Sequence, residues 1–148
     1  MKLRALQTCL ALCLACLAGH GMAQSAPLPV CPVATELPVQ RLYGLWRAEF
    51  IETGSQRATA SATVLFERHP AFAQGVRGAI AHGQGMALLS GDADEGVFTL
   101  DESVDGIHIS ATWTGNIVPH ACGKEIRGTW TDITRQRTLD FVLRKLPD

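Results

Sequence analysis

The chain has no excess of positive charge and only one long apolar run. Of its 13 Lys and Arg residues, Lys2 and Arg4 lie in the first 23 positions, so 11 remain after residue 23 against 14 Asp and Glu. Nucleic acid is therefore excluded as an expected partner, because its binding needs clustered positive charge. The apolar run, residues 5–18, is shorter than the roughly 20 residues that a membrane-spanning helix needs.

Sequence motifs for catalysis and for metal binding are also missing after residue 23. There is no Gly-x-Ser-x-Gly nucleophile elbow and no Cys-x2-Cys pair. The histidines in this region lack the His-x3-His spacing of a zinc site; they are His69, His82, His108 and His120. We therefore expect no catalytic residues, no metal and no cofactor, and we rank an enzyme last among the function classes.

Residues 1–23 have the features of a secretory signal peptide. A short basic start precedes the apolar run 5–18, and small residues precede the expected cleavage after Ala23. A membrane anchor is the first alternative, but the run is short. A lipoprotein signal is the second, but its best cysteine, Cys16, lies inside the run. We expect export to the periplasm or the extracellular medium, with no membrane span after cleavage.

Cleavage would leave two of the five cysteines, Cys31 and Cys122. Thiols oxidise in exported proteins, so we predict one intramolecular disulfide between them. Two free thiols, or a bond between chains, are the alternatives. Residues 24–42 contain four prolines and little periodicity, which predicts an extended leader on the surface of a domain formed by residues 43–148. Cys31 would hold this leader in place.

Residues 43–148 contain short alternations of apolar and polar residues separated by Gly, Asp, Asn or Pro. Eight strands are predicted, at 43–52, 60–68, 75–81, 85–91, 96–103, 107–116, 124–132 and 137–145. No segment keeps a helical period over three turns. The predicted inward-facing residues are Trp46, Ala48, Phe50, Ala62, Val64, Phe66, Val76, Gly78, Ile80, Met86, Leu88, Phe98, Leu100, Ile109, Ala111, Trp113, Ile126, Gly128, Trp130, Leu139, Phe141 and Leu143.

The predicted fold class is all-β. Short connections favour neighbour-to-neighbour pairing of strands, and closing the sheet removes its exposed edges. We therefore predict an eight-stranded antiparallel up-and-down barrel, with a two-sheet β-sandwich as the alternative. Glu102 has the spacing of the inward-facing set, and burial at that position would raise its pKa. We instead expect Glu102 to lie in water at the end of its strand.

Three short motifs resemble the calycin family of β-barrels. Gly44-Leu45-Trp46 on the first strand and Arg144 on the last are similar to the calycin pattern, in which a basic side chain covers that tryptophan. Thr112-Trp113-Thr114-Gly115-Asn116 and Gly128-Thr129-Trp130 resemble the two tryptophan strands of the avidin/streptavidin type. The resemblance implies a small barrel with aromatic walls.

This resemblance does not extend to the polar side chains that hold biotin in avidins. The corresponding positions carry Ala48, Ile80 and Ala111, and a polar ligand head needs hydrogen-bonding partners there. A further resemblance is to the small secreted metalloprotease inhibitors, also exported barrels with one disulfide.

Two functions compete on these grounds. The first is an exported barrel that holds a small apolar or amphipathic molecule between Trp46, Trp113, Trp130, Phe50 and Phe66. The second is a periplasmic or secreted protein-interaction module with a filled core, like a protease inhibitor or an envelope accessory protein, that contacts another exported protein. A filled interior is common in barrels of eight strands.

Overall fold

The protein is described by a computed structural model that covers residues 31–83 and 85–147. Two short 3-10 helices come first, η1 (Ala34–Glu36) and η2 (Val39–Leu42). Eight strands follow: β1 (Gly44–Ile51), β2 (Ala58–Arg68), β3 (Gly75–His82), β4 (Gly85–Asp94), β5 (Val97–Ser103), β6 (Ala111–Ile117), β7 (Glu125–Asp132) and β8 (Arg137–Lys145). The predicted signal peptide, residues 1–23, lies outside the described residues.

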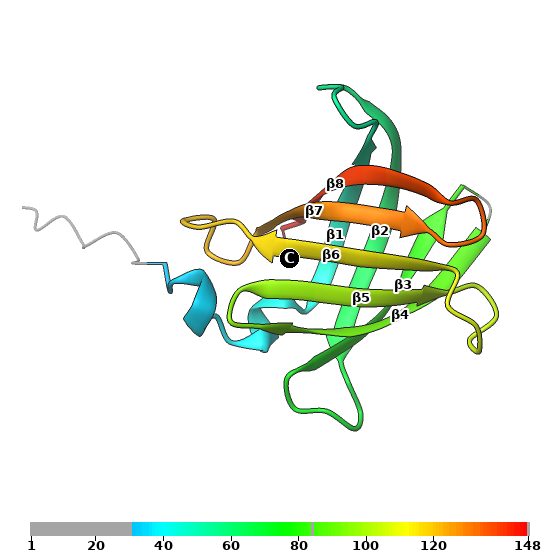
Figure 1. The fold of residues 1–148 in the computed structure, drawn as a ribbon. Helices are drawn as coiled ribbons and strands as arrows, with labels where there is room; N and C mark the ends of the chain where they lie inside the picture. The colour runs from blue at the N-terminus through cyan, green and yellow to red at the C-terminus, as the bar shows by residue number, and fades with distance from the viewer. Residues whose placement is uncertain (1–30, 84, 148) are drawn as a thin grey trace, which may run out of the picture.

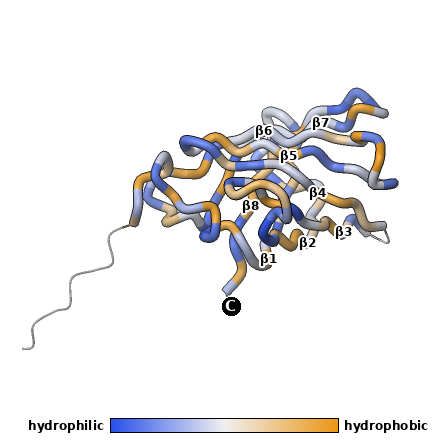
Figure 2. The backbone as a smooth tube through the Cα atoms, turned by 90° about the horizontal axis from the view of Figure 1, so that it is seen from below, coloured by the Kyte–Doolittle hydropathy of each residue, from blue (hydrophilic) through white to orange (hydrophobic). Residues whose placement is uncertain are grey.

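The eight strands form one closed antiparallel barrel in sequence order, as Figure 1 shows, which confirms the predicted fold class. The barrel closes where β1 pairs with β8, from Trp46 opposite Lys145 to Ile51 opposite Asp140. Buried and exposed residues alternate most clearly along β1, β5 and β6, and Figure 2 shows hydrophobic and hydrophilic stretches interspersed along the tube. Each strand therefore turns one row of side chains into a common core.

Antiparallel order gives the barrel two distinct ends. The base is the end where β1 begins, and it includes the connections β2–β3, β4–β5 and β6–β7. The mouth is the opposite end, and it includes the connections β1–β2, β3–β4, β5–β6 and β7–β8. In Figure 1 the 3-10 helices lie at the base and the β5–β6 loop lies at the mouth.

The leader covers the base of the barrel. Val39 and Leu42 of η2 are buried among the core side chains, and the Leu42 carbonyl accepts a 2.7 Å hydrogen bond from Trp46 Nε1. No part of the leader was expected in the core from the sequence. The leader contributes these two apolar residues because an open barrel end would expose Trp46 to water.

Cys31 and Cys122 pair in the structure, with their Cα atoms 4.8 Å apart across a sequence separation of 91 residues. The bond joins the start of the described leader to the β6–β7 connection at the base. Gly123 follows with a φ of 73° and lies so close to Leu37 that a Cβ atom would meet its side chain at 2.6 Å. The leader is therefore held against the barrel by both covalent and packing contacts.

The inward-facing row predicted for β4 is wrong. Met86 and Leu88 were expected inside, but they face outward, and Leu88 is 57% exposed. Ala87 and Leu89 are the buried residues, because pairing with β3 places Ala87 opposite Ile80 and Leu89 opposite Gly78. Four consecutive apolar residues carry no alternation, so the sequence alone did not define the register.

The predicted start of β6 is also wrong. The strand begins at Ala111 instead of residue 107, and Ile109, expected inside, is 48% exposed. A carboxylate oxygen of Asp105 accepts hydrogen bonds from the backbone N–H groups of Ile107 and His108. Asp105 thereby folds these residues into a loop at the mouth instead of extending the strand.

The basic residue of the calycin pattern takes a different place here. Arg144 does not cover Trp46; it lies on the outer face, and its guanidinium binds Glu49 at 2.6 Å and Glu125 at 3.2 Å. Lys145 is the residue opposite Trp46, and its Nζ donates to the Arg41 carbonyl at 2.8 Å. Adjacent residues of a strand face opposite sides of the sheet, so only one of Arg144 and Lys145 can share the face of Trp46.

Among the described residues, η1 and η2 are the only helices, and neither is long or apolar enough to cross a membrane.

Candidate functional site

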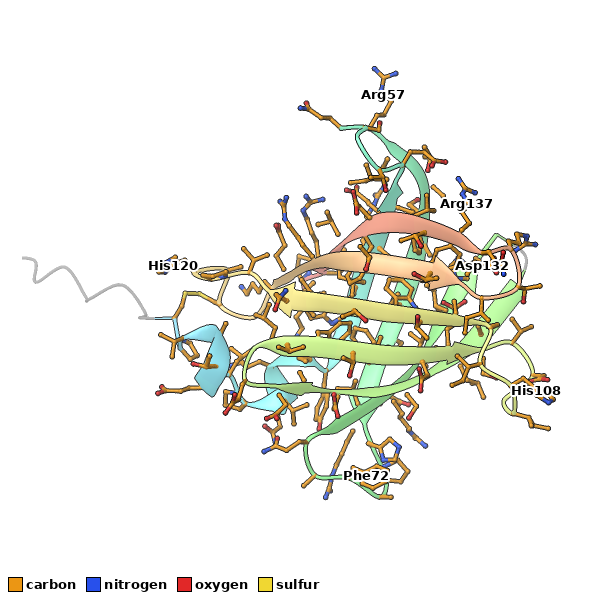
Figure 3. All side chains as sticks on the ribbon, in the orientation of Figure 1. Arg57, Phe72, His108, His120, Asp132 and Arg137 are labelled. Atoms are coloured by element: carbon orange, nitrogen blue, oxygen red, sulfur yellow. A yellow bond between two sulfur atoms is a disulfide. The ribbon has the colours of Figure 1, made fainter. Side chains whose placement is uncertain are left out.

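The mouth of the barrel contains a pocket of about 490 Å³, called here the mouth pocket. Its walls come from the mouth ends of β3, β5, β6 and β7 and from the loops beside them. The lining residues are His82, Glu102, Val104, Ser110, Ala111, Trp130, Asp132, Thr134 and Arg135. Figure 3 places Asp132 at this end of the barrel and His120 at the opposite end.

Glu102 is the central polar group of the mouth pocket. It is the last inward-facing residue of β5, after Phe98 and Leu100, and only 4% of it is exposed. Its Oε2 accepts hydrogen bonds from Trp113 Nε1 and Trp130 Nε1, both at 3.0 Å. Its Oε1 lies 3.2 Å from His82 Nε2. The expectation that Glu102 lies in water is therefore wrong.

The register of the sheet explains why these groups meet. Trp113 on β6 lies opposite Trp130 on β7 and opposite Leu100 on β5. Glu102 is two residues beyond Leu100 on the same face, which places it diagonally across from Trp113. Diagonal neighbours on one face of a sheet are within reach of long side chains. The two indole N–H groups consequently converge on one carboxylate oxygen.

Electrostatics keep the Glu102 carboxylate ionised. Burial acts to raise the pKa of Glu102, but the hydrogen bonds from His82, Trp130 and Trp113 outweigh it and lower the pKa below its usual range. An ionised carboxylate can only accept hydrogen bonds, so the His82 Nε2 atom must carry the proton and donate. This fixes the direction of all three hydrogen bonds to Glu102.

Aromatic rings support the site from below. The ring centroid of Phe50 lies 5.3 Å from that of Trp113, 5.4 Å from that of Trp130 and 5.7 Å from that of His82. Trp113 also packs edge-on against Phe141 at 4.9 Å. These contacts limit the rotation of both indole rings. The rings around Glu102 are therefore held in place before any ligand arrives.

The five aromatic residues named from the sequence divide into two groups. Phe50, Trp113 and Trp130 lie together around Glu102. Trp46 and Phe66 lie in the half of the barrel nearer the base, where their ring centroids are 5.9 Å apart and both are buried. The assignment of all five aromatic residues as ligand-binding residues remains a prediction.

The rim of the mouth pocket carries a closed ion pair. Asp132 is buried, and its two carboxylate oxygens accept hydrogen bonds from the backbone N–H and the guanidinium of Arg135, both at 2.8 Å. Burial opposes ionisation of Asp132, but these bonds to Arg135 outweigh it and lower its pKa. The Asp132–Arg135 pair therefore contributes no net charge to the pocket.

Neither Glu102 nor His82 is among the site residues predicted from the sequence. The available signal was a carboxylate in phase with Phe98 and Leu100, beside two strands with inward-facing tryptophans. His82 falls just beyond the predicted strand 75–81, but it ends β3 and its ring reaches Glu102. In residues 31–83 and 85–147, no group of three or more His, Cys, Asp or Glu side chains is arranged to hold a metal ion.

A comparison with protein-family models gives no match for this chain, and a comparison with curated proteins gives none either.

Proposed function

We propose that this chain is an exported, calycin-like binding barrel that holds a small amphipathic molecule in its mouth pocket. One observation carries the proposal: a buried, ionised carboxylate, fixed by two indole N–H groups and a histidine, forms the inner surface of an open pocket. Trp130, Ala111 and Val104 add apolar surface beside the polar lining residues, and small-molecule sites combine apolar surface with convergent polar groups. Export is supported by the pairing of Cys31 with Cys122, since such bonds persist in oxidising compartments.

We propose binding rather than catalysis for this site. A general acid or base works best when its pKa lies near the operating pH. The pKa of Glu102 is lowered, and three donors already stabilise its charged form. Glu102 is therefore a weak base, and its geometry suits the orientation of a ligand.

Tryptophan fluorescence tests the proposal. The neutral probe N-phenyl-1-naphthylamine and a panel of small aromatic alcohols, amines and acids are titrated into the folded chain. We expect a saturable change in emission that is lost in Trp130→Phe, because Trp130 lines the pocket. Trp46→Phe is the matched control and should keep the response, because Trp46 is buried near the base. Unchanged fluorescence across the whole panel would refute the proposal.

A protein-interaction module is the second candidate, and an apolar groove of about 520 Å³ on the outer face of β2–β5 favours it. Leu65 and Leu88 line this groove and are exposed. Exposed apolar patches of this kind often mark protein contacts. Under this alternative, Leu88→Asp abolishes capture of an exported partner in a crosslinking experiment and Trp130→Phe has no effect on it.

A further inference from the structure

We infer that the mouth pocket selects an organic cation: an amine whose ammonium group donates to Glu102 Oε1 and whose apolar part rests on Trp130. This inference rests on the function proposed above and names the class of ligand. Three properties of the lining carry it: its charge, its remaining hydrogen-bond capacity and the position of its indole ring.

The pocket lining contains two carboxylates. Asp132 is paired with a permanent cation, Arg135, and Glu102 is not. Arg135 is the one Lys or Arg residue among the lining residues, and its guanidinium already donates to Asp132 Oδ2 at 2.8 Å, while its backbone N–H donates to Oδ1. Among the described residues, Glu102 is matched only by neutral indole N–H groups and by His82. A ligand anion would meet this negative charge in a partly desolvated pocket, where charge repulsion is stronger than in water.

Glu102 also keeps capacity for one more donor. A carboxylate has about four acceptor positions. Oε2 uses two for Trp113 and Trp130, and Oε1 uses one for His82. A fourth donor therefore fits at Oε1, the oxygen next to the rim histidine, whose side chain is 37% exposed. An ammonium group supplies such a donor together with the matching charge.

The wall next to Glu102 suits the apolar part of an amine. Trp130 is half-buried, lines the pocket and donates its N–H to Glu102, so its ring is held in one orientation. Ala111 and the exposed Val104 continue the apolar surface toward the rim. The apolar part of an amine held at Glu102 can be buried against this aromatic wall.

Calorimetric titration with three probes of similar size tests this inference: 2-phenylethylamine, 2-phenylethanol and 3-phenylpropionate. At pH 7 they are cationic, neutral and anionic. We expect the amine to bind about tenfold more tightly than the alcohol, the effect of one charge-assisted hydrogen bond, and the carboxylate to bind weakest. The three affinities are measured on the unaltered chain, so their comparison does not depend on the folding of a variant.

Two variants locate the selectivity. In Glu102→Gln the amine should bind no more than about twofold more tightly than the alcohol. Glu67→Gln removes the same charge from the outer face of β2, where Glu67 is exposed, and should keep the full preference. Circular dichroism confirms that both variants are folded.

The outcomes separate this inference from the proposed function. Equal affinity for the amine and the alcohol, or tighter binding of the carboxylate, would overturn the cation inference and leave a binding barrel in place. The same holds if Glu102→Gln keeps the tenfold preference. Absence of binding by all three probes would overturn both.

Discussion

Replacing Glu102 by leucine tests whether this buried carboxylate holds the mouth of the barrel together. The substitution leaves the N–H groups of Trp113 and Trp130 without their acceptor. An unsatisfied buried donor costs about 1–3 kcal/mol. The cost applies fully at Trp113, which is buried, and partly at the half-buried Trp130, which water can reach. We expect a total loss of about 2–4 kcal/mol, against a typical domain stability of about 5–15 kcal/mol.

Two further variants distinguish the lost hydrogen bonds from a change in packing. Glu102→Gln keeps a carbonyl oxygen that can accept both indole N–H groups, so it should cost only about 1 kcal/mol. In a Trp113→Phe background one of the two orphaned donors is absent, and Glu102→Leu should then cost about 1–2 kcal/mol less than in the unaltered chain.

Urea unfolding followed by far-ultraviolet circular dichroism measures these free energies without relying on the altered tryptophans. Two results would refute the reasoning. One is a Glu102→Leu variant as stable as the parent chain. The other is an equal cost of Glu102→Leu in the presence and absence of the Trp113 indole.

Three further predictions concern pH, the disulfide and the register of β4. Because the folded pKa of Glu102 is lowered, its stabilising effect is present above the pKa of an unfolded glutamate, about 4.3. That effect is lost as the pH falls through the lower folded value. Urea unfolding between pH 6 and 3 should therefore show a smaller loss of stability in Glu102→Gln than in the parent chain, and equal losses would contradict this. Replacing Cys31 and Cys122 by serine opens a link across 91 residues, and the chain-entropy model gives a loss of up to about 4–5 kcal/mol; an unchanged melting temperature would argue against a formed bond. Leu89→Ala should cost about 2–5 kcal/mol because Leu89 is 3% exposed. Leu88→Ala should cost less than about 0.5 kcal/mol, and the reverse order in thermal unfolding would show that the register is shifted.

The barrel itself could be predicted from the sequence, because several strands alternate clearly and turn signals separate them. In β1 and β5, for example, every second residue is buried, so the pattern alone identified the inward-facing row. Residues 86–89 lack that alternation, and only pairing with Ile80 and Gly78 of β3 decides which of them face the core. The inward-facing row of β4 therefore depends on its pairing with β3, which the local sequence does not show.

The base of the barrel could not be predicted from local patterns. Val39 and Leu42 stand in a proline-rich segment without periodicity, and their burial depends on an open barrel end that forms far along the chain. The disulfide could be predicted by counting, because two cysteines outside residues 1–23 leave one intramolecular pairing.

The site could be predicted only in part. Trp113, Trp130 and Phe50 were identified as interior aromatics, and they do lie together. The meeting of Glu102 with His82 depends on the curvature of the sheet, since β3 and β5 lie on either side of β4 and are not hydrogen-bonded neighbours. A general rule that strand-end carboxylates face water led to the wrong position for Glu102.

The three indole N–H groups offer the most direct test of the mouth pocket as the ligand site. Trp113 and Trp130 donate to Glu102 at the mouth, whereas Trp46 donates to the Leu42 carbonyl at the base. In a proton–nitrogen correlation spectrum of the 15N-labelled chain, titration with 2-phenylethylamine should shift the indole resonances of Trp113 and Trp130 and leave that of Trp46 in place. A shift of Trp46 alone, or saturation of the protein with no indole shift, would contradict the account.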